Sequence, residues 1–279
     1  MPELPEVEVI RRGLQAHLPG RRIEAVFHSG KQLRHPVPLA AMQKSLVGRR
    51  IAGVARRAKF LLLSMEDGAI LILHLGMTGR LGLFPAGSAA ALHDHVRWRL
   101  DDGLELRLHD TRRFGSVRVV TAAEAPDIES TFFKATGPEP FGAACTPAYL
   151  FGQAQGKRQP VKTFLMDMRI IAGVGNIYAN ECLYTCGINP SRPAADLRLR
   201  DWRRLLPNLR AILQQAIDCG GSTISDYVNA GGKPGYFQVH FQVYGREGEP
   251  CPECGTPIDK IRLGGRASYF CPKCQGTIG

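Results

Sequence analysis

CPECGTPIDKIRLGGRASYFCPKC, which spans residues 251–274, is the stretch of the chain that says most about its fold. It contains four cysteines in two Cys-x-x-Cys pairs: Cys251, Cys254, Cys271 and Cys274. Pairs at this separation place four thiolates tetrahedrally around one ion, the geometry that Zn²⁺ prefers. Two disulfides, or iron in the same cage, are the alternatives, and a reducing cytoplasm disfavours the disulfides. Because the protein fills all four positions, we expect one structural Zn²⁺ that holds a β-hairpin carrying Lys260, Arg262 and Arg266.

The composition indicates a folded, basic protein. Its 279 residues include 36 Lys and Arg against 25 Asp and Glu, a net charge of +11, and 44% of the residues are hydrophobic. Disorder along the whole chain is therefore excluded. The longest apolar runs are too short to span a membrane, and the start MPELPEVEVI lacks the order of a secretory signal, so we expect a cytoplasmic protein.

A basic protein without a membrane segment favours phosphate-rich partners, and an ordinary basic surface is the alternative. Residues 1–130 and residues 131–221 each carry a net charge of +5, whereas residues 222–279 carry +1. No basic tail is present, so a groove between two lobes fits this pattern better than a detachable arm.

The first half of the chain predicts one helix followed by strands. Apolar residues recur at helical spacing over residues 5–17, behind a proline that suits a first helical position. Short apolar runs at 60–65 and 70–75 are typical of strands. Residues 96–100 and 104–108 alternate strictly around an Asp-Gly turn, which predicts a β-hairpin with one buried face.

The second half turns helical after a Pro- and Gly-rich stretch at residues 137–147. Helical spacing covers 161–168 and breaks at the Gly-Val-Gly of 173–175. A longer helical pattern runs from 197 to 219, where Pro207 should start a new helix or kink the existing one.

The segment Pro-Glu-Leu-Pro-Glu-Val-Glu, residues 2–8, resembles the start of the bacterial formamidopyrimidine-DNA glycosylases, a family that also removes 8-oxoguanine. Further blocks similar to the family's occur along the whole chain: residues 56–60, 74–77, 93–96, 112–115, 173–178, 232–237 and the zinc hairpin. Each block alone is weakly specific, and their combination is highly specific.

The resemblance implies an α+β, multi-domain fold. Its parts are an N-terminal catalytic β-sandwich with an N-terminal helix, a linker, a helix-two-turn-helix domain, and a lesion-capping loop followed by a C-terminal zinc β-hairpin finger. We expect these parts at residues 1–132, 133–150, 151–221 and 222–279, respectively.

The resemblance also implies a bifunctional DNA glycosylase and AP lyase of base excision repair. Such an enzyme excises oxidised purines, 8-oxoguanine and formamidopyrimidines, from duplex DNA and cleaves the strand by β,δ-elimination. The implied partner is damaged double-stranded DNA, with no membrane, and the protein is expected to be a monomer in the bacterial cytoplasm, associated with the nucleoid. One structural Zn²⁺ and no catalytic metal are implied.

Pro2 becomes reactive only when Met1 is removed, because its ring nitrogen is then a free secondary amine. Free α-amines have a pKa of about 8, so an unprotonated fraction exists near neutral pH. The resemblance implies that this amine attacks C1′ of the damaged nucleotide and forms an imine, with Glu3 as proton donor and acceptor. Without the resemblance, Pro2 and Glu3 would be read as favouring a helix start.

Two further residues are implied to act in strand cleavage. Lys59 is expected at the edge of the apolar strand of residues 60–63, where it contacts phosphate or the lesion and assists β-elimination. Arg266 matches the family's zinc-hairpin arginine, which binds the flanking phosphates and takes part in δ-elimination. The alternatives are a strand-end lysine with its amine in water and an exposed hairpin arginine.

A glycosylase must also extrude the damaged nucleotide and fill the space that it leaves. The resemblance assigns this role to Met77, Arg112 and Phe114. Without the resemblance, Met77 and Phe114 would be interpreted as core residues. A thioether and a ring can slide between bases, and a guanidinium can hydrogen-bond the orphaned base. Thr111 stands where the family usually has proline.

The remaining DNA contacts implied by the resemblance are phosphate contacts: His74, His93, Lys157 and Asn176. Each alone would be an ordinary surface or strand residue. His95 shares a strand face with His93 if the strand extends that far, and its role stays open. Residues 221–236 correspond to the family's loop over the flipped base.

Two rival functions remain. One is the related glycosylase branch for oxidised pyrimidines, which residues 2–8 disfavour. The other is a non-catalytic zinc DNA-binding protein on the same scaffold. The four cysteines outside the zinc pairs are most simply core residues: Cys145, Cys182, Cys186 and Cys219.

Overall fold

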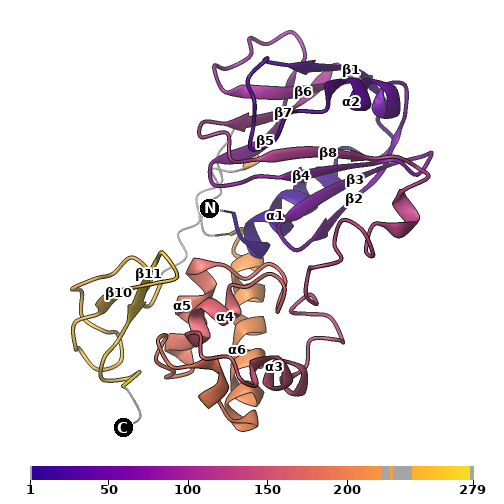
Figure 1. Ribbon diagram of the computed structural model, residues 1–279. Coiled ribbons are helices and arrows are strands. Elements are labelled where there is room, and N and C mark those ends of the chain that lie inside the picture. The colour runs from indigo at the N-terminus through magenta and orange to yellow at the C-terminus, as the bar shows by residue number, and fades with distance from the viewer. Residues whose placement is uncertain (1, 222–226, 229–240, 277–279) are drawn as a thin grey trace. The chain divides into compact units, whose positions relative to one another are not determined.

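The computed structural model describes residues 2–221, 227–228 and 241–276. The chain divides into two compact units. The first comprises residues 1–134 and 219–238, and the second comprises residues 135–218 and 239–279. In Figure 1 the colour follows the chain from the strands of the first unit to the helices and hairpin of the second.

The first unit is a β-sandwich that follows an N-terminal helix (Figure 1). Its elements are α1 (Leu4–Gln15), β1 (Ile23–His28), α2 (Leu39–Leu46), β2 (Ile51–Arg57), β3 (Phe60–Met65), β4 (Ile70–His74), β5 (Gly79–Pro85), β6 (Asp94–Leu100), β7 (Leu104–Asp110), β8 (Ser116–Val120), η1 (Ala125–Asp127) and β9 (Tyr227–Val228). One sheet has the order β1-β6-β7-β5-β9 and the other β2-β3-β4-β8. A single hydrophobic core joins both sheets with α1 and α2, which confirms the expected N-terminal sandwich.

The hairpin β6–β7 forms at the predicted place. Val96 pairs with Leu108 and Trp98 with Leu106 across the antiparallel strands, and Trp98 is 1% exposed. Gly103 in the turn has φ +80°, a conformation that glycine adopts readily. The alternation of the sequence therefore identified the apolar face correctly. The expectation of a single buried face was wrong for β7, because Glu105 and Arg107 on its other face are 0% and 2% exposed and form an ion pair with each other.

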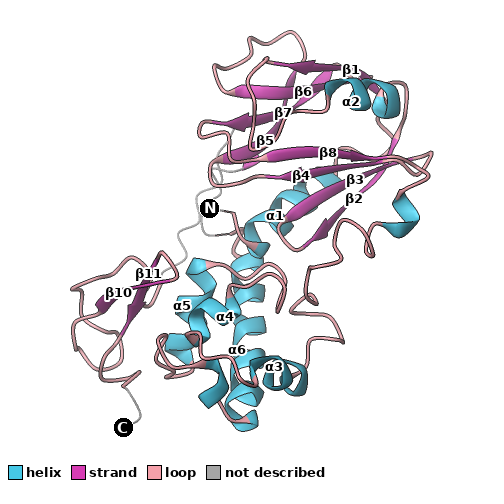
Figure 2. Cartoon of the chain, in the orientation of Figure 1, coloured by secondary structure: helices cyan, strands magenta, loops and turns pink. Residues whose placement is uncertain are grey.

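The second unit contains helices and the zinc hairpin. Its elements are α3 (Pro147–Ala154), α4 (Val161–Leu165), α5 (Asn176–Thr185), η2 (Ala194–Asp196), α6 (Leu199–Asp218), β10 (Asp259–Leu263) and β11 (Arg266–Phe270). Figure 2 shows helices α3 to α6 as one group and the antiparallel pair β10–β11 as a separate two-stranded sheet. This helical domain followed by a hairpin is the expected architecture.

Two expectations for these helices were wrong in detail. The helix predicted over 161–168 ends at Leu165, because the Asp167 carboxylate accepts the backbone N–H of Arg169 at 3.0 Å in a local turn that competes with the helix. Pro207 lies inside the continuous helix α6, so the expectation that it starts a new helix was wrong. The alternative, a kink in the existing helix, stays a prediction. Residues such as Trp202 and Leu209 bury one face of α6 in the core, and this burial offsets the hydrogen bond that Pro207 cannot make.

Within the described residues, none of the helices is long and apolar enough to cross a membrane.

Candidate active site and zinc centre

The start of the chain is buried and fixed by its helix. Glu3, the N-cap of α1, is 1% exposed, and its backbone N–H donates to Glu6 Oε2 at 2.8 Å in a capping box. Gly221 has φ +86°, and a Cβ at this position would lie 3.4 Å from Glu6 Cγ. The residue that follows Met1, Pro2, is also buried. Pro2 and Glu3 are therefore held beside a helix N-terminus, where a carboxylate is electrostatically favourable.

Lys59 lies in a tight turn rather than in an apolar strand. The turn joins β2 to β3 and contains Ala58, whose φ is +54°. Lys59 is half-buried, and its charge acts on His74 of β4. The positive charge of Lys59 in this turn thus acts on the His74 imidazole, and both are predicted site residues.

His74 is a neutral hydrogen-bond donor near neutral pH. Burial, followed by the positive charges of Lys59 and Arg34, lowers the pKa of His74 to about 4. The Nδ1 atom of His74 accepts the backbone N–H of Gly76 at 3.1 Å, which leaves the proton on Nε2. His74 can therefore donate one hydrogen bond to a phosphate oxygen without carrying charge.

The three residues predicted to fill the vacated space lie on two loops of the first unit. Met77 is in the turn after β4, while Arg112 and Phe114 follow β7. The Arg112 guanidinium lies 4.7 Å from the centre of the Phe114 ring, and Phe114 is 42% exposed. Phe114 is therefore not a core residue. An exposed ring stacked against a guanidinium suits a contact with bases.

A buried carboxylate joins these two loops, and the sequence did not reveal it. Asp110 is 0% exposed. It accepts hydrogen bonds from Thr78 Oγ1 at 2.6 Å and from the Gly115 backbone N–H at 2.7 Å, and Thr78 Oγ1 accepts the Arg112 N–H at 3.1 Å. These bonds fix the backbone of Arg112 although Thr111 replaces the family's usual proline.

Gly76 is a position at which the two loops approach each other closely. Its φ is +64°, and a Cβ added there would lie 2.3 Å from the backbone carbon of Phe114. We expect Gly76→Ala to lower the free energy of unfolding by about 3 kcal/mol, because the left-handed conformation and the overpacking each cost energy. Urea unfolding of both proteins measures this. Gly87→Ala, where a Cβ meets nothing within 4 Å, is the control, and an equal midpoint for Gly76→Ala and wild type would contradict the close packing.

The role of His95, left open by the sequence, is structural. His95 is buried, its Nε2 bonds the Asp110 carbonyl at 3.1 Å, and its Nδ1 bonds Ser29 Oγ at 2.9 Å. Burial lowers the pKa of His95. His93 lies next to it, with ring centres 6.0 Å apart, and is only half-buried. His93 is therefore accessible to a ligand, whereas His95 supports the end of β7.

The second unit carries three of the predicted site residues besides the four zinc cysteines. Asn176 is the first residue of α5, and its Oδ1 has no hydrogen-bond partner within the described part of the chain although it is buried. Arg266 and Lys157 are exposed. Arg266 begins β11 after the turn Gly264–Gly265, where both residues have positive φ. Lys157 and Arg266 therefore present cationic donors at the surface, whereas the buried Asn176 Oδ1 is an acceptor.

Asn180 and Lys162 attach the hairpin to the helices. Asn180 Oδ1 accepts the Tyr269 N–H at 2.8 Å, and Asn180 Nδ2 donates to the Asn176 carbonyl at 2.6 Å. Lys162 Nζ donates to the Ala267 carbonyl at 2.7 Å. The strand that begins with Arg266 is thus bonded to α4 and α5 through buried side chains.

Glu181 is a second buried carboxylate that sequence reasoning missed. It accepts three backbone N–H groups at 2.8, 3.0 and 2.8 Å: those of Gln242, Val243 and Tyr244. Burial raises the pKa of Glu181, and these three hydrogen bonds oppose the shift. The carboxylate anchors residues 242–244 to α5. The predicted lesion-capping loop precedes them and lies, apart from residues 221, 227 and 228, outside the described residues.

The four cysteines of the two Cys-x-x-Cys pairs meet at one point. Their Sγ atoms all lie within 4.8 Å of one another. Tyr184 Oη lies 3.2 Å from Cys251 Sγ, and the Cys274 N–H donates to Cys271 Sγ at 3.3 Å. Four thiolates with such hydrogen bonds are the donor set of a structural Zn²⁺ site. Of the remaining cysteines, three lie in the helical core, as expected: Cys145, Cys182 and Cys186. The expectation was wrong for Cys219, which is half-buried.

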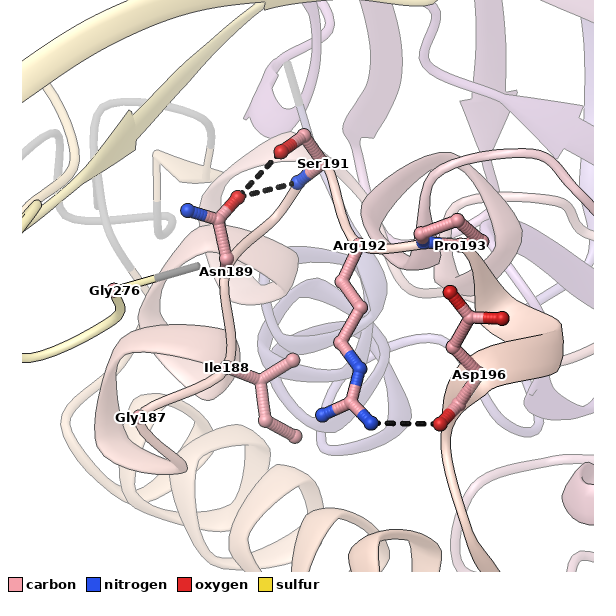
Figure 3. A pocket seen from close by; sticks show the side chains of 8 residues that line it. All are labelled: Gly187, Ile188, Asn189, Ser191, Arg192, Pro193, Asp196 and Gly276. Atoms are coloured by element: carbon pink, nitrogen blue, oxygen red, sulfur yellow. Dashed lines mark hydrogen bonds between the residues drawn. The ribbon is translucent and has the colours of Figure 1, made fainter. Parts of the chain in front are cut away.

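A pocket of about 370 Å³ lies in the second unit (Figure 3). Its lining consists of Gly187, Ile188, Asn189, Ser191, Arg192, Pro193, Asp196 and Gly276. None of the predicted site residues is among them, so the candidate site is not this pocket.

A sandwich with a buried N-terminal dipeptide, a helical domain and a four-cysteine hairpin together define a class of zinc-containing DNA repair proteins. Three family descriptions match in the same order: "Formamidopyrimidine-DNA glycosylase N-terminal domain" at residues 1–117, "Formamidopyrimidine-DNA glycosylase H2TH domain" at 136–228, and "Zinc finger found in FPG and IleRS" at 248–276. The chain belongs to the formamidopyrimidine-DNA glycosylase family.

Relatives resemble the chain over nearly its whole length. Formamidopyrimidine-DNA glycosylases of Nitrosococcus oceani and Magnetococcus marinus are 46% and 44% identical over 275 residues, covering 99% of this chain and 100% and 99% of theirs. The crystal structure of wild-type Lactococcus lactis Fpg in complex with a DNA containing N7-benzyl-Fapy-dG is 32% identical, with a TM-score of 0.89, and covers 99% of this chain and 100% of that one. These matches bear out the resemblance that the sequence motifs indicated.

Proposed function

We propose that the protein is a bifunctional DNA glycosylase and AP lyase of base excision repair that excises oxidised purines from duplex DNA. The observation that carries this is the buried Pro2–Glu3 start, fixed on the N-terminus of α1, in a chain 44–46% identical to formamidopyrimidine-DNA glycosylases over nearly its whole length. We place the enzyme in the bacterial cytoplasm, on nucleoid DNA.

The first chemical step is base excision by Pro2 after removal of Met1. The nitrogen lone pair of Pro2 forms a bond to C1′ as the bond from C1′ to the base breaks, and the base leaves with that electron pair and takes up a proton. Glu3 gives and takes protons beside the reacting carbon. The nitrogen then loses its proton, and its lone pair forms a double bond to C1′ as the bond from C1′ to O4′ breaks and O4′ takes up a proton. The product is a ring-opened cationic imine that joins Pro2 to C1′.

Two eliminations then cleave the strand. Loss of a proton from C2′ expels the 3′ phosphate, and loss of a proton from C4′ expels the 5′ phosphate. Lys59 assists the first elimination from the β2–β3 turn. Arg266 binds the phosphates and assists the second. The result is a one-nucleotide gap with phosphate at both ends.

Base extrusion is assigned to the two loops joined by Asp110. Met77 and Phe114 insert into the stack, and Arg112 hydrogen-bonds the orphaned base, for which cytosine is the preferred partner. The exposed Phe114 ring and the fixed backbone of Arg112 support this assignment. Unstacking a nucleotide costs a few kcal/mol, and these contacts offset that cost.

DNA binding is assigned to residues of both units: His74, His93, Arg112, Lys157, Asn176 and Arg266. If the cations among them, Arg112, Lys157 and Arg266, neutralise about two to three phosphates, raising the salt concentration from about 50 to 200 mM should weaken binding roughly 10- to 40-fold. Fluorescence anisotropy with a duplex containing an uncleavable abasic analogue measures this. Lys157→Met should reduce the slope of log Kd against log salt by about one, because it removes one phosphate contact. A flat salt response would contradict the assignment.

Borohydride trapping on duplex DNA tests the proposed function. We expect a covalent adduct with a duplex that contains 8-oxoguanine opposite cytosine, and a much weaker one with oxidised thymine. A stronger adduct with oxidised thymine would instead support the pyrimidine branch. Binding without any adduct would support a non-catalytic DNA-binding protein and overturn the proposal.

A further inference from the structure

Two charged residues without a role in the proposed mechanism connect the helix that follows Pro2 to the turn that carries Lys59. Arg56 Nε lies 3.2 Å from Glu8 Oε2, and the two side chains are only 11% and 14% exposed. Glu8 is in α1 and Arg56 is in β2. Arg56 Nη1 also donates to the backbone carbonyl of Ala58 at 2.9 Å. One guanidinium thus bridges the helix and the turn.

The carbonyl that Arg56 binds belongs to a strained residue. Ala58 is completely buried and has φ +54°, a left-handed conformation that the Cβ of an L residue disfavours. The hydrogen bond from Arg56 reaches this residue, which immediately precedes Lys59. Arg56 therefore restrains the backbone from which the Lys59 side chain extends.

Glu8 supplies the charge that holds Arg56 in place. Burial alone would raise the pKa of Glu8, but hydrogen bonds from Arg11 and Arg12 and the charge of Arg56 lower it below the ordinary value. Glu8 is thus ionised near neutral pH. Arg11 and Arg12 bind the same carboxylate at 2.8 and 3.1 Å from within α1, whereas Arg56 binds it from β2.

We propose that Glu8 and Arg56 are positioning residues, which fix Lys59 relative to the helix start that bears Pro2 and Glu3. The inference rests on the proposed function, in which Lys59 assists β-elimination. Glu8 orients the Arg56 guanidinium, and Arg56 stabilises the left-handed turn at Ala58. Loss of this link should slow elimination and leave imine formation by Pro2 almost unchanged.

Single-turnover kinetics on a duplex with a preformed abasic site test the inference, because this substrate bypasses base excision. Borohydride quenching at each time point measures the imine, and gel analysis measures the cleaved strand. For Arg56→Met we expect elimination about 10- to 100-fold slower with imine accumulating, since small misplacements of a reacting group have effects of this size. Arg56→Lys, which keeps the charge but loses the fork that reaches both partners, should act in the same direction.

A rescue variant and a matched control separate positioning from general stability. Ala58→Gly in the Arg56→Met background should restore much of the elimination rate, because glycine adopts positive φ without help. Arg12→Met removes an arginine that binds the same Glu8 carboxylate but is 50% exposed. It should leave both rates unchanged.

Three results would overturn the inference while the proposed function stands: wild-type elimination in both Arg56 variants, equal slowing of imine formation and elimination, or no rescue by Ala58→Gly. If the wild-type protein forms no imine at all, the proposed function is overturned, and this inference with it.

Discussion

Blocking the nitrogen of Pro2 is expected to abolish the trapped adduct. A variant with extra residues retained before Pro2 has an amide in place of the free secondary amine, and an amide nitrogen cannot attack C1′. We expect base excision and strand cleavage to fall by roughly three orders of magnitude or more, as is usual when a nucleophile is removed. Pro2→Gly, which keeps a terminal amine but makes it primary, should reduce the adduct less completely.

Binding to the lesion duplex separates lost chemistry from lost structure in these variants. The blocked variant should still bind the duplex with a Kd within about threefold of wild type, because the phosphate contacts lie elsewhere. The same extension placed at the C-terminus is the matched control and should be fully active. An undiminished adduct in either the blocked variant or Pro2→Gly would contradict Pro2 as the nucleophile.

Removing the zinc is expected to have the second-largest effect. Cys271 is 0% exposed, and its Sγ is within the four-sulfur cluster. We expect Cys271→Ser to lose the ion and the hairpin, because a small hairpin has little core of its own and zinc binding is worth about 10–16 kcal/mol in isolated zinc fingers. Strand cleavage should fall by at least about 100-fold as Arg266 loses its place.

Cys219→Ser is the matched control for the zinc prediction. Cys219 is half-buried and lies outside the cluster, so its replacement should leave both the zinc content and cleavage unchanged. Zinc released by a thiol reagent can be counted with a chromogenic chelator. Full cleavage by zinc-free Cys271→Ser would show that the hairpin does not position Arg266.

The parts of the fold that could be predicted are those with a local signal. Residues 96–108 combine strict alternation with an Asp-Gly turn, and the four zinc cysteines stand at metal-binding spacing. The structure confirms both the hairpin and the cluster. The helix end at Leu165 and the uninterrupted passage of α6 through Pro207 depend on a local side-chain turn and on core burial, which periodicity does not report.

The candidate site was predictable only in part, for a related reason. Motif blocks identified residues that can touch DNA, such as Phe114 and Arg266. Supporting residues such as Asp110 and Glu181 bond partners that are remote in sequence: Asp110 accepts the Thr78 hydroxyl, and Glu181 accepts the backbone N–H groups of residues 242–244. Lys59 lies in a turn because Ala58 adopts a positive φ. Alanine rarely adopts this conformation, so nothing in the sequence indicated the turn.

In the proposed mechanism the protein reacts with DNA through the nitrogen of Pro2. The most direct measurement is proteolysis of the borohydride-trapped complex followed by mass spectrometry of the peptide that carries the sugar. We expect the sugar remnant on the N-terminal peptide that begins at Pro2, without Met1. A remnant on the peptide that contains Lys59, or a trapped chain that still carries Met1, would contradict it.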